Sequence, residues 1–150
     1  MKIGFGCDHA GLEMKEYLMK YLEKQGHEIY DYAPLLPGEK IDYPFPAAAV
    51  GDAITEGKID CGILVCGTGI GMSIAANKVP GIRAAHVSDP YSARLTKQHN
   101  NAQIICLGGR VIGLELAKDI VDAYLGAEYE GGRHQKRLDL ITMMEESWKD

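Results

Sequence analysis

The sequence predicts an α/β fold: a three-layer αβα sandwich with a five-stranded parallel sheet between two layers of helices. Short apolar runs alternate with stretches of helical periodicity along the whole chain, as expected for successive βα units. The run Cys61–Cys66 (CGILVC) is apolar almost throughout, which is typical of a strand that is covered on both faces. Glycine and proline recur between these segments, where turns are expected.

The first two predicted strands flank a helix. The apolar run Lys2–Cys7 predicts the first strand. Across residues 12–25, apolar side chains recur with 3-1-3-1 spacing, which predicts a helix, and Gly26 ends it. His27–Tyr32 predicts the second strand, and the proline-rich segment 33–46 predicts a loop.

The same alternation continues to the C-terminal part of the chain. A helix over residues 47–56, closed by Gly57, precedes the third strand, Cys61–Cys66. Further along the chain, a helix from Asp89 to residue 99 has its N-cap at Asp89, and a proline follows this cap directly. The remaining elements are a short helix over 71–77, strands over Ile82–Val87 and Gln103–Gly108, a helix over 114–125 and an amphipathic C-terminal helix over Arg133–Trp148.

The chain length and the strand pattern together predict one domain. A chain of 150 residues is the usual size for a single hydrophobic core, so we expect one domain over residues 1–150. For the sheet we expect the order 2-1-3-4-5, in which the winding direction reverses between strands one and three.

The composition predicts a soluble, cytosolic protein. The formal net charge of −5 disfavours a nucleic-acid-binding surface, although a small anionic ligand needs only a local positive cluster. No apolar run is long enough to cross a bilayer, and the N-terminal segment lacks the apolar core of a signal peptide. Free thiols are expected, and the cysteine spacing is poor for a metal site. The cysteines are Cys7, Cys61, Cys66 and Cys106.

The carboxyl ends of the strands are the expected location of a ligand site. Open parallel sheets bind ligands there, where the winding direction changes. Four short segments follow the strands: Asp8-His9, Gly67–Gly71, Ser88-Asp89 and Gly108–Arg110. The expected order brings Asp8 and His9 next to the glycine-rich segment.

The glycine-rich loop, LVCGTGIGMS from Leu64 to Ser73, predicts an anion site. Glycines let backbone N–H groups approach a ligand at a helix N-terminus. A phosphate-binding P-loop is excluded, because no Gly-Lys-Ser/Thr follows. A dinucleotide site needs G-x-G-x-x-G; Gly67 and Gly69 fit, but Met72 occupies the third glycine position. Asp89 could still serve as a ribose-binding acid, so a nucleotide site stays open.

Cys66 ends the third strand directly before the N–H groups of this loop. Such a position favours a thiolate, which could act as a base or a nucleophile. The alternative is a small apolar residue that ends a core strand, and this alternative suits Cys7, Cys61 and Cys106 well. A redox role is disfavoured, because no resolving cysteine is evident.

Five motifs, in this order, carry a resemblance to a known family: GCDHAG, DYP, CGTGIGMSIAANK, QHNNA and RHQKR. Together they closely resemble the type B ribose-5-phosphate isomerases, within the family that also holds galactose-6-phosphate and allose-6-phosphate isomerases. The resemblance covers essentially the whole chain. It implies a cofactor-free aldose–ketose isomerase with a Rossmann-like or flavodoxin-like sheet. It also implies dimers, often paired into tetramers, whose active sites are shared between subunits.

The resemblance assigns the proton transfer to the glycine-rich loop. Cys66 matches the base that moves a proton between C2 and C1, because Met72 stands where some members carry a carboxylate. The loop N–H groups would stabilise the enediolate as an oxyanion hole, and Thr68 would hydrogen-bond a substrate oxygen. These N–H groups belong to Gly67, Thr68, Gly69, Ile70 and Gly71.

The resemblance also assigns ring opening and phosphate binding. His99 matches the ring-opening residue and Asn100 a sugar-hydroxyl ligand; without the resemblance they would merely end a helix. Arg133 and Arg137 lie on one helix face and match a phosphate clamp; alone they would be a solvated basic patch. The remaining predicted contacts are His9 and Arg110 to the phosphate, Asp8 to a hydroxyl group and Tyr43 beside the sugar.

We therefore predict interconversion of D-ribose 5-phosphate and D-ribulose 5-phosphate in the pentose phosphate pathway, without cofactor or metal. The expected partners are a sugar phosphate and further copies of the chain, as a dimer or tetramer, with no nucleic acid and no membrane. Two alternatives remain: isomerisation of a hexose 6-phosphate, allose or galactose, and a nucleotide-binding module built on Gly67–Gly71.

Overall fold

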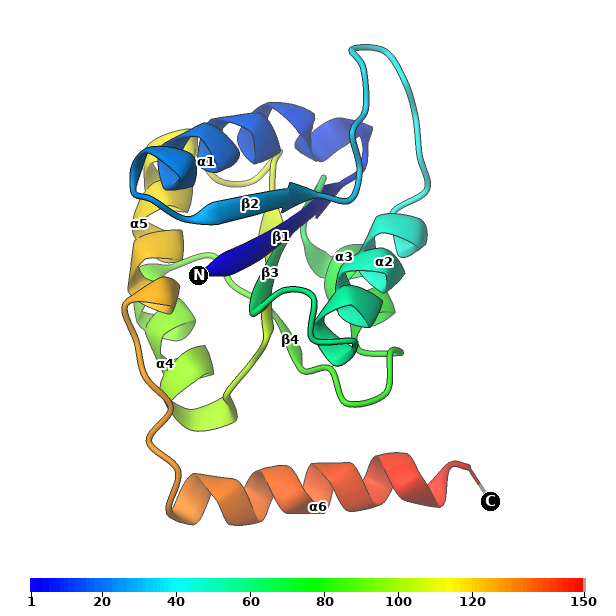
Figure 1. Cartoon of the computed structure of the whole chain (residues 1–150), viewed down its shortest axis with the longest axis vertical. Coiled ribbons are helices and arrows are strands. Elements are labelled where there is room, and N and C mark those ends of the chain that lie inside the picture. Colours follow the sequence, from blue (N-terminus) through cyan, green and yellow to red (C-terminus); the bar gives the residue numbers. More distant parts are fainter. Residues whose placement is uncertain (150) are drawn as a thin grey trace.

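The computed structural model describes residues 1–149 and contains a five-stranded parallel sheet between two layers of helices (Figure 1). The strands are β1 (Lys2–Cys7), β2 (Glu28–Asp31), β3 (Cys61–Cys66), β4 (Ala84–His86) and β5 (Ile104–Gly108). The helices are α1 (Leu12–Lys24), α2 (Pro44–Thr55), α3 (Ile70–Ala76), α4 (Pro90–Asn100), α5 (Leu114–Leu125) and α6 (Arg133–Ser147), and a short 3-10 turn, η1 (His9–Gly11), precedes α1. The predicted α/β sandwich with a C-terminal helix is confirmed.

The strand order is β2-β1-β3-β5-β4, so the predicted order 2-1-3-4-5 is wrong in its last two positions. All five residues of β5 are buried, and β5 pairs with β3 from Gly62↔Ile104 to Cys66↔Gly108. By contrast, β4 has three residues and none of them is buried. The strand that is apolar on both faces therefore takes the inner position, and the short strand forms the edge.

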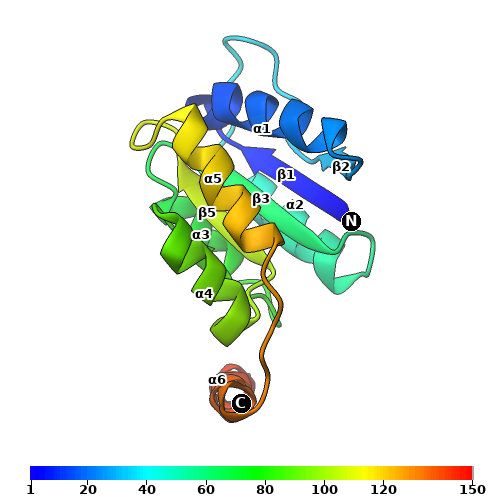
Figure 2. The same cartoon turned by 90° about the vertical axis from the view of Figure 1, so that its left-hand side faces the viewer.

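This order distributes the helices over the two faces of the sheet. Helices α1, α4 and α5 cover one face, and α2 and α3 cover the other (Figures 1 and 2). Each face has its own apolar core, because alternate residues of β3 point to opposite sides. Ile63 and Val65 pack toward α1 and α5, whereas Leu64 and Cys66 pack toward α2 and α3.

Local chemistry explains where several elements end. Gly26 and Gly57 adopt left-handed backbone angles, φ 88° and 72°, that end α1 and α2. The Asp89 carboxylate accepts a 2.7 Å hydrogen bond from the Ser92 N–H, which confirms it as the N-cap of α4. Helix α2 begins at Pro44, earlier than predicted, because prolines are well tolerated in a first helical turn.

The outer edge of β4 is occupied by a side chain. The Asn77 amide donates to the Ala84 carbonyl oxygen at 2.8 Å, and its oxygen accepts from the Ala84 N–H at 2.9 Å. The two bonds resemble those of a neighbouring strand, so the exposed backbone of this edge strand is satisfied at Ala84.

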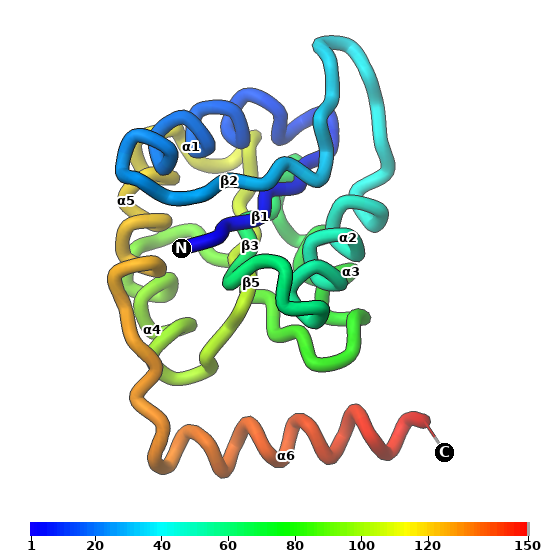
Figure 3. The backbone as a smooth tube through the Cα atoms, viewed as in Figure 1, coloured from blue at the N-terminus to red at the C-terminus, as the bar shows by residue number. Residues whose placement is uncertain are grey.

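Helix α6 projects from the body at the sheet edge where the strands begin (Figure 3). His134 and Leu138 are its only buried residues within the described part of the chain. Its exposed apolar side chains are Leu140, Ile141, Met143, Met144 and Trp148. Across residues 1–149, no helix combines the length and the apolar character that a membrane span needs.

Candidate functional site

The glycine-rich loop places a backbone N–H group against the Cys66 sulfur. Cys66 is 4% exposed, and its Sγ accepts a hydrogen bond from the Gly69 N–H at 3.2 Å. Gly69 has φ +82°, and a Cβ there would lie 2.8 Å from the Leu107 carbonyl carbon. The turn therefore requires glycine. It points the Gly69 N–H at the Cys66 sulfur, and a thiolate accepts such a hydrogen bond more strongly than a thiol does.

The turn after β1 lies beside this loop, as predicted. Asp8 donates its N–H to the Val65 carbonyl oxygen at 3.2 Å, and its carboxylate accepts from the Ala10 N–H at 2.9 Å. Asp8 thus caps η1, while the neighbouring His9 side chain is exposed. A Cβ at Gly11 would lie 2.3 Å from the Val65 oxygen, so close packing of the two loops requires glycine.

The turn after β5 borders the loop on its other side. The Gly109 N–H donates to the Cys66 carbonyl oxygen at 2.8 Å, and the Arg110 N–H donates to that of Gly67 at 3.0 Å. A Cβ at Gly67 would lie 3.7 Å from Nη1 of Arg110. The Arg110 guanidinium therefore lies alongside the loop, where it can bind an anion.

Tyr43 completes this group from the start of α2. A Cβ at Gly71 would lie 2.9 Å from the Tyr43 ring, so the phenol lies against the loop only because Gly71 has no side chain. We call this group the loop cluster. It comprises Asp8, His9, Tyr43, Cys66, Gly67, Thr68, Gly69, Ile70, Gly71 and Arg110.

The other predicted site residues lie at the opposite end of the strands, where the strands begin. Helix α4 starts after the carboxyl end of β4 and runs back, so His99 and Asn100 lie near the start of β5. Arg133 and Arg137 lie on α6, which packs against the end of α4 (Figure 1). We call these four residues the α4–α6 cluster. A single chain does not bring it together with the loop cluster.

Two further residues join the α4–α6 cluster. The His99 and His134 rings stack with centroids 4.2 Å apart and planes 13° from parallel. Oε2 of Glu130 lies 3.4 Å from Nε2 of His134 and 3.9 Å from Nε2 of His99. Sequence reasoning assigned no role to His134; the available signal was the Glu130–His134 spacing of four residues beside Arg133.

The other three cysteines belong to the cores, as predicted. Cys7, Cys61 and Cys106 are at most 1% exposed. Burial raises the pKa of Cys7 to about 11 and that of Cys61 to about 12. Burial also raises the pKa of Cys106. These thiols are therefore protonated and unreactive near neutral pH.

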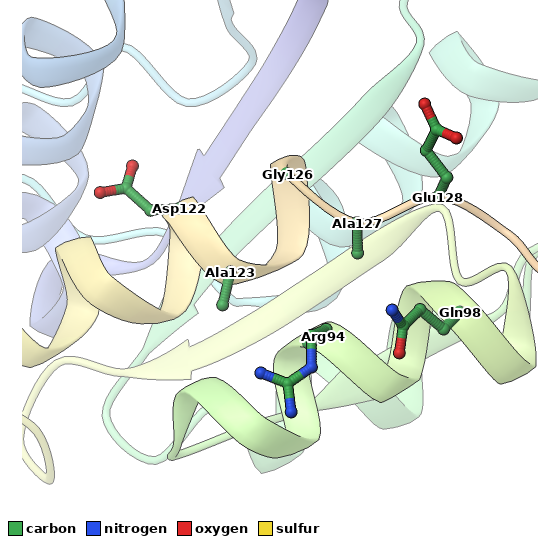
Figure 4. Close-up of a pocket in the computed structure, with 7 residues that line it drawn as sticks. All are labelled: Arg94, Gln98, Asp122, Ala123, Gly126, Ala127 and Glu128. Atoms are coloured by element: carbon green, nitrogen blue, oxygen red, sulfur yellow. The ribbon is translucent and has the colours of Figure 1, made fainter.

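One surface hollow borders the last turns of α4 and α5. It has a volume of about 510 Å³ and lies between α4 and α5 (Figure 4). Its side chains are charged, amide or small, and it contains none of the predicted site residues. They are Arg94, Gln98, Asp122, Ala123, Gly126, Ala127 and Glu128. The glycine-rich loop therefore remains the better candidate for chemistry.

The geometry disfavours a dinucleotide site. Asp89, the candidate ribose-binding acid, follows the edge strand β4, which is separated from β3 by β5. The hydrogen bonds that its carboxylate accepts from Ser92 lower its pKa and commit it to capping α4. The carboxylate is thus already engaged in capping a helix rather than free to bind a ribose.

Comparison with known proteins agrees with the motifs. The chain matches the family described as Ribose/Galactose Isomerase over residues 3–141. It is 52% identical to ribose-5-phosphate isomerase B of Escherichia coli K12, over 97% of each chain. It is 46% identical to D-erythrulose-4-phosphate isomerase of Pectobacterium atrosepticum, over 99% of this chain and 98% of the relative.

A solved structure gives the same result for the fold. Ribose-5-phosphate isomerase B of Clostridium thermocellum superposes with a TM-score of 0.96 at 48% identity, over 99% of both chains. The predicted resemblance is confirmed by a family match that spans most of the sequence. The chain belongs to the ribose/galactose isomerase family.

Proposed function

We propose that the protein interconverts D-ribose 5-phosphate and D-ribulose 5-phosphate, with Cys66 as the base. The observation that carries the proposal is the Gly69 N–H donated to the Cys66 sulfur, within a chain 52% identical to a ribose-5-phosphate isomerase B. An aldose–ketose isomerisation needs a base beside the carbonyl carbon and donors for the enediolate that forms. The loop cluster offers both.

The proton transfer takes place between neighbouring carbons. The Cys66 thiolate removes the C2 proton of the open-chain aldose, and the electron pair forms the C1–C2 double bond of the enediolate. The proton then returns to C1, while the proton of the C2 hydroxyl group moves to the C1 oxygen, so that C2 becomes the carbonyl carbon. N–H groups from Gly67 to Gly71 stabilise the negative oxygens, and Thr68 binds a substrate oxygen and assists the hydroxyl proton transfer.

The α4–α6 cluster serves the other end of the substrate. His99 donates the proton that opens the sugar ring, and Asn100 binds a hydroxyl group. Arg133 and Arg137 bind the phosphate together with His9 and Arg110. Asp8 orients a hydroxyl group near the reacting carbons, and Tyr43 flanks the sugar. These assignments follow the family motifs quoted from the sequence.

A second copy of the chain supplies the second cluster to each site. The two clusters lie at opposite ends of the parallel strands (Figure 1). One chain therefore offers one part of a site at each end. Two-fold association places the α4–α6 cluster of each copy over the loop cluster of the other. The exposed apolar face of α6 supports this arrangement, because such surfaces on soluble proteins usually contact a partner.

The proposal places the enzyme in the reducing cytosol, where Cys66 stays reduced. The neighbouring candidate is isomerisation of another sugar phosphate. The family description includes galactose, and one relative is named for a four-carbon substrate. All these reactions share the loop chemistry and differ in the length of the carbon chain between carbonyl and phosphate.

A direct assay tests the proposal. Chelator-treated enzyme is offered ribose 5-phosphate, allose 6-phosphate, galactose 6-phosphate and D-erythrose 4-phosphate, and the ketose product is measured. We expect ribose 5-phosphate to give the highest kcat/KM. A higher value for another sugar phosphate would reassign the substrate. Tight nucleotide binding without isomerase activity would show instead that the protein is a nucleotide-binding module.

A further inference from the structure

The end of α4 and the start of α6 share a group of three side chains whose role the family motifs leave open. His99 comes from α4, His134 from α6 and Glu130 from the segment between α5 and α6. The Glu130 N–H donates to the Gln98 carbonyl oxygen at 3.0 Å, which fixes this segment to the last turn of α4. The three side chains are therefore held together by backbone contacts as well as by their own.

His134 is the buried member of the group. Its side chain is 6% exposed, whereas that of His99 is 35% exposed. Within residues 1–149, Nε2 of His134 is buried and has no hydrogen-bond partner. A buried polar atom without a partner costs free energy, so its retention indicates a role beyond packing.

The stack restricts how the His99 ring can turn. With the ring planes 13° from parallel and the centroids 4.2 Å apart, rotation of His99 would push its ring into that of His134. Glu130 faces both rings, because its Oε2 lies within 4 Å of each Nε2. One imidazole of the pair can therefore carry a proton opposite a carboxylate.

The surroundings of the pair disfavour a proton on His134. Burial lowers the pKa of His134, and His99, Arg133 and Arg137 oppose a second positive charge there. Glu130 acts in the opposite direction but is half exposed. A proton on His134 is thus disfavoured, and its buried ring serves as the surface against which the His99 ring stacks.

The orientation of the rings argues against a metal site at these residues. The ring nitrogens of two parallel imidazoles point in parallel directions, whereas the ligands of one ion must converge on it. The stacked arrangement instead suits a pair in which one ring fixes the plane of the other.

We propose that His134 and Glu130 are positioning residues for ring opening: His134 fixes the plane of the His99 imidazole, and Glu130 stabilises its proton. This inference rests on the proposed function. In the step, the C1–O4 bond of the furanose breaks, O4 takes the proton of His99, and the proton of the C1 hydroxyl group passes to water. The C1 aldehyde forms, and His99 regains a proton from water.

The test separates ring opening from enolisation. D-ribulose 5-phosphate cannot close a furanose ring, because its C5 hydroxyl group is phosphorylated. Exchange of its C1 proton with deuterium in D₂O therefore needs Cys66 but no ring opening. Turnover of ribose 5-phosphate needs both steps, so the two rates report on different parts of the site.

Three variants are compared with the wild type: His134→Asn, Glu130→Gln and, as a matched carboxylate control, Glu128→Gln. We expect His134→Asn and Glu130→Gln to lower ribose 5-phosphate turnover at least about tenfold and to leave deuterium exchange within about twofold. His99→Asn should show the same pattern more strongly, and Glu128→Gln should change neither rate. Circular dichroism melting checks the fold; Glu130 and Glu128 are exposed, so both glutamate variants should melt like the wild type.

Each outcome decides between the two proposals. Wild-type enzyme that neither converts ribose 5-phosphate nor exchanges the ribulose 5-phosphate proton would overturn the proposed function. If the wild type is active and both Glu130→Gln and His134→Asn keep its turnover, the positioning roles alone are overturned. Equal loss of turnover and exchange in folded variants would also overturn them, because a general structural or phosphate-binding defect affects both rates.

Discussion

Cys66 differs from the three other cysteines in what surrounds its sulfur. All four thiols border an apolar core, and burial raises the pKa of Cys7, Cys61 and Cys106. The sulfur of Cys66 instead accepts an N–H bond from a loop that has further N–H groups beside it. The same residue type therefore serves packing at three positions and is available for chemistry at one.

Replacing the base should stop proton transfer and leave anion binding. We expect Cys66→Ala to slow both ribose 5-phosphate turnover and deuterium exchange into ribulose 5-phosphate by roughly 10²- to 10⁴-fold, the usual contribution of a general base. Affinity for inorganic phosphate should stay within about twofold of the wild type, because no phosphate ligand is removed. Cys7→Ala, in the opposite core, is the control. Near-normal exchange in Cys66→Ala would show that another group is the base.

The surroundings of the thiols also predict their reactivity. At about pH 8, iodoacetamide should modify Cys66 and inactivate the enzyme, whereas the other three stay unmodified until the protein unfolds. Cys7, with a pKa of about 11, becomes a thiolate only when the pH approaches that value. Peptide mass spectrometry after labelling identifies the modified residue. Early modification of Cys7 or Cys61 would contradict the assignment.

Two elements, α4 and α6, determine where the second cluster lies. Helix α4 runs from the carboxyl edge of the sheet to the opposite edge, and α6 packs on its end through His134 and Leu138. Arg133 and Arg137 lie one turn apart on α6 and are exposed. The helix therefore presents two guanidinium groups away from its buried side.

Removing either arginine should weaken phosphate binding. We expect Arg133→Ala and Arg137→Ala each to lower kcat/KM for ribose 5-phosphate by roughly 10- to 100-fold, mainly through a higher KM, because each loses charge-assisted hydrogen bonds. Steady-state kinetics measure the effect. Lys136→Ala removes an equal charge from the same turn and should change KM by less than about twofold. An equal effect of Lys136→Ala would indicate general attraction rather than a clamp.

At the level of elements, much of the fold follows from local sequence patterns, whereas the order of the strands does not. The periodicity of residues 12–25 and the apolar run Cys61–Cys66 predict α1 and β3 correctly. The exchange of β4 and β5 was missed, although Ile104–Gly108 is apolar throughout whereas Ala84–His86 is short and ends in a histidine. Strand pairing depends on non-local contacts that no single segment contains.

The candidate site was predictable to a similar extent. The loop cluster follows from the rule that ligands bind at carboxyl ends of strands. The opposite location of His99 also follows from direction, because a helix after a parallel strand must run back before the next strand begins. The contact between His134 and Glu130 could not be predicted, since it depends on how α6 packs against α4.

On the scale of the whole molecule, two uncovered apolar surfaces accompany the two clusters. Ile70 and Ile74 are exposed on α3 beside the glycine-rich loop, and Phe45 is exposed on α2. The other surface is formed by the exposed apolar side chains of α6. A two-fold dimer that covers these surfaces would also complete both sites, so assembly and catalysis would be coupled.

Mixing two inactive variants tests the shared site. Cys66→Ala and His99→Asn chains are unfolded together and refolded at equal amounts. Half of the dimers then contain both chains, and each of these has one intact site, so we expect about a quarter of wild-type ribose 5-phosphate turnover. Each variant refolded alone is the control. Turnover no higher than the average of the two controls would show that each site is built within one chain.

The Asn77 amide that pairs with Ala84 has a consequence for how copies of this chain can meet. An unpaired edge strand is a template on which another molecule's strand can add, and repeated addition leads to fibrils. Here one edge of the sheet ends in a three-residue strand whose Ala84 backbone groups are already satisfied by a side chain. In the folded chain, addition of a foreign strand at this edge would first have to break the two Asn77 hydrogen bonds.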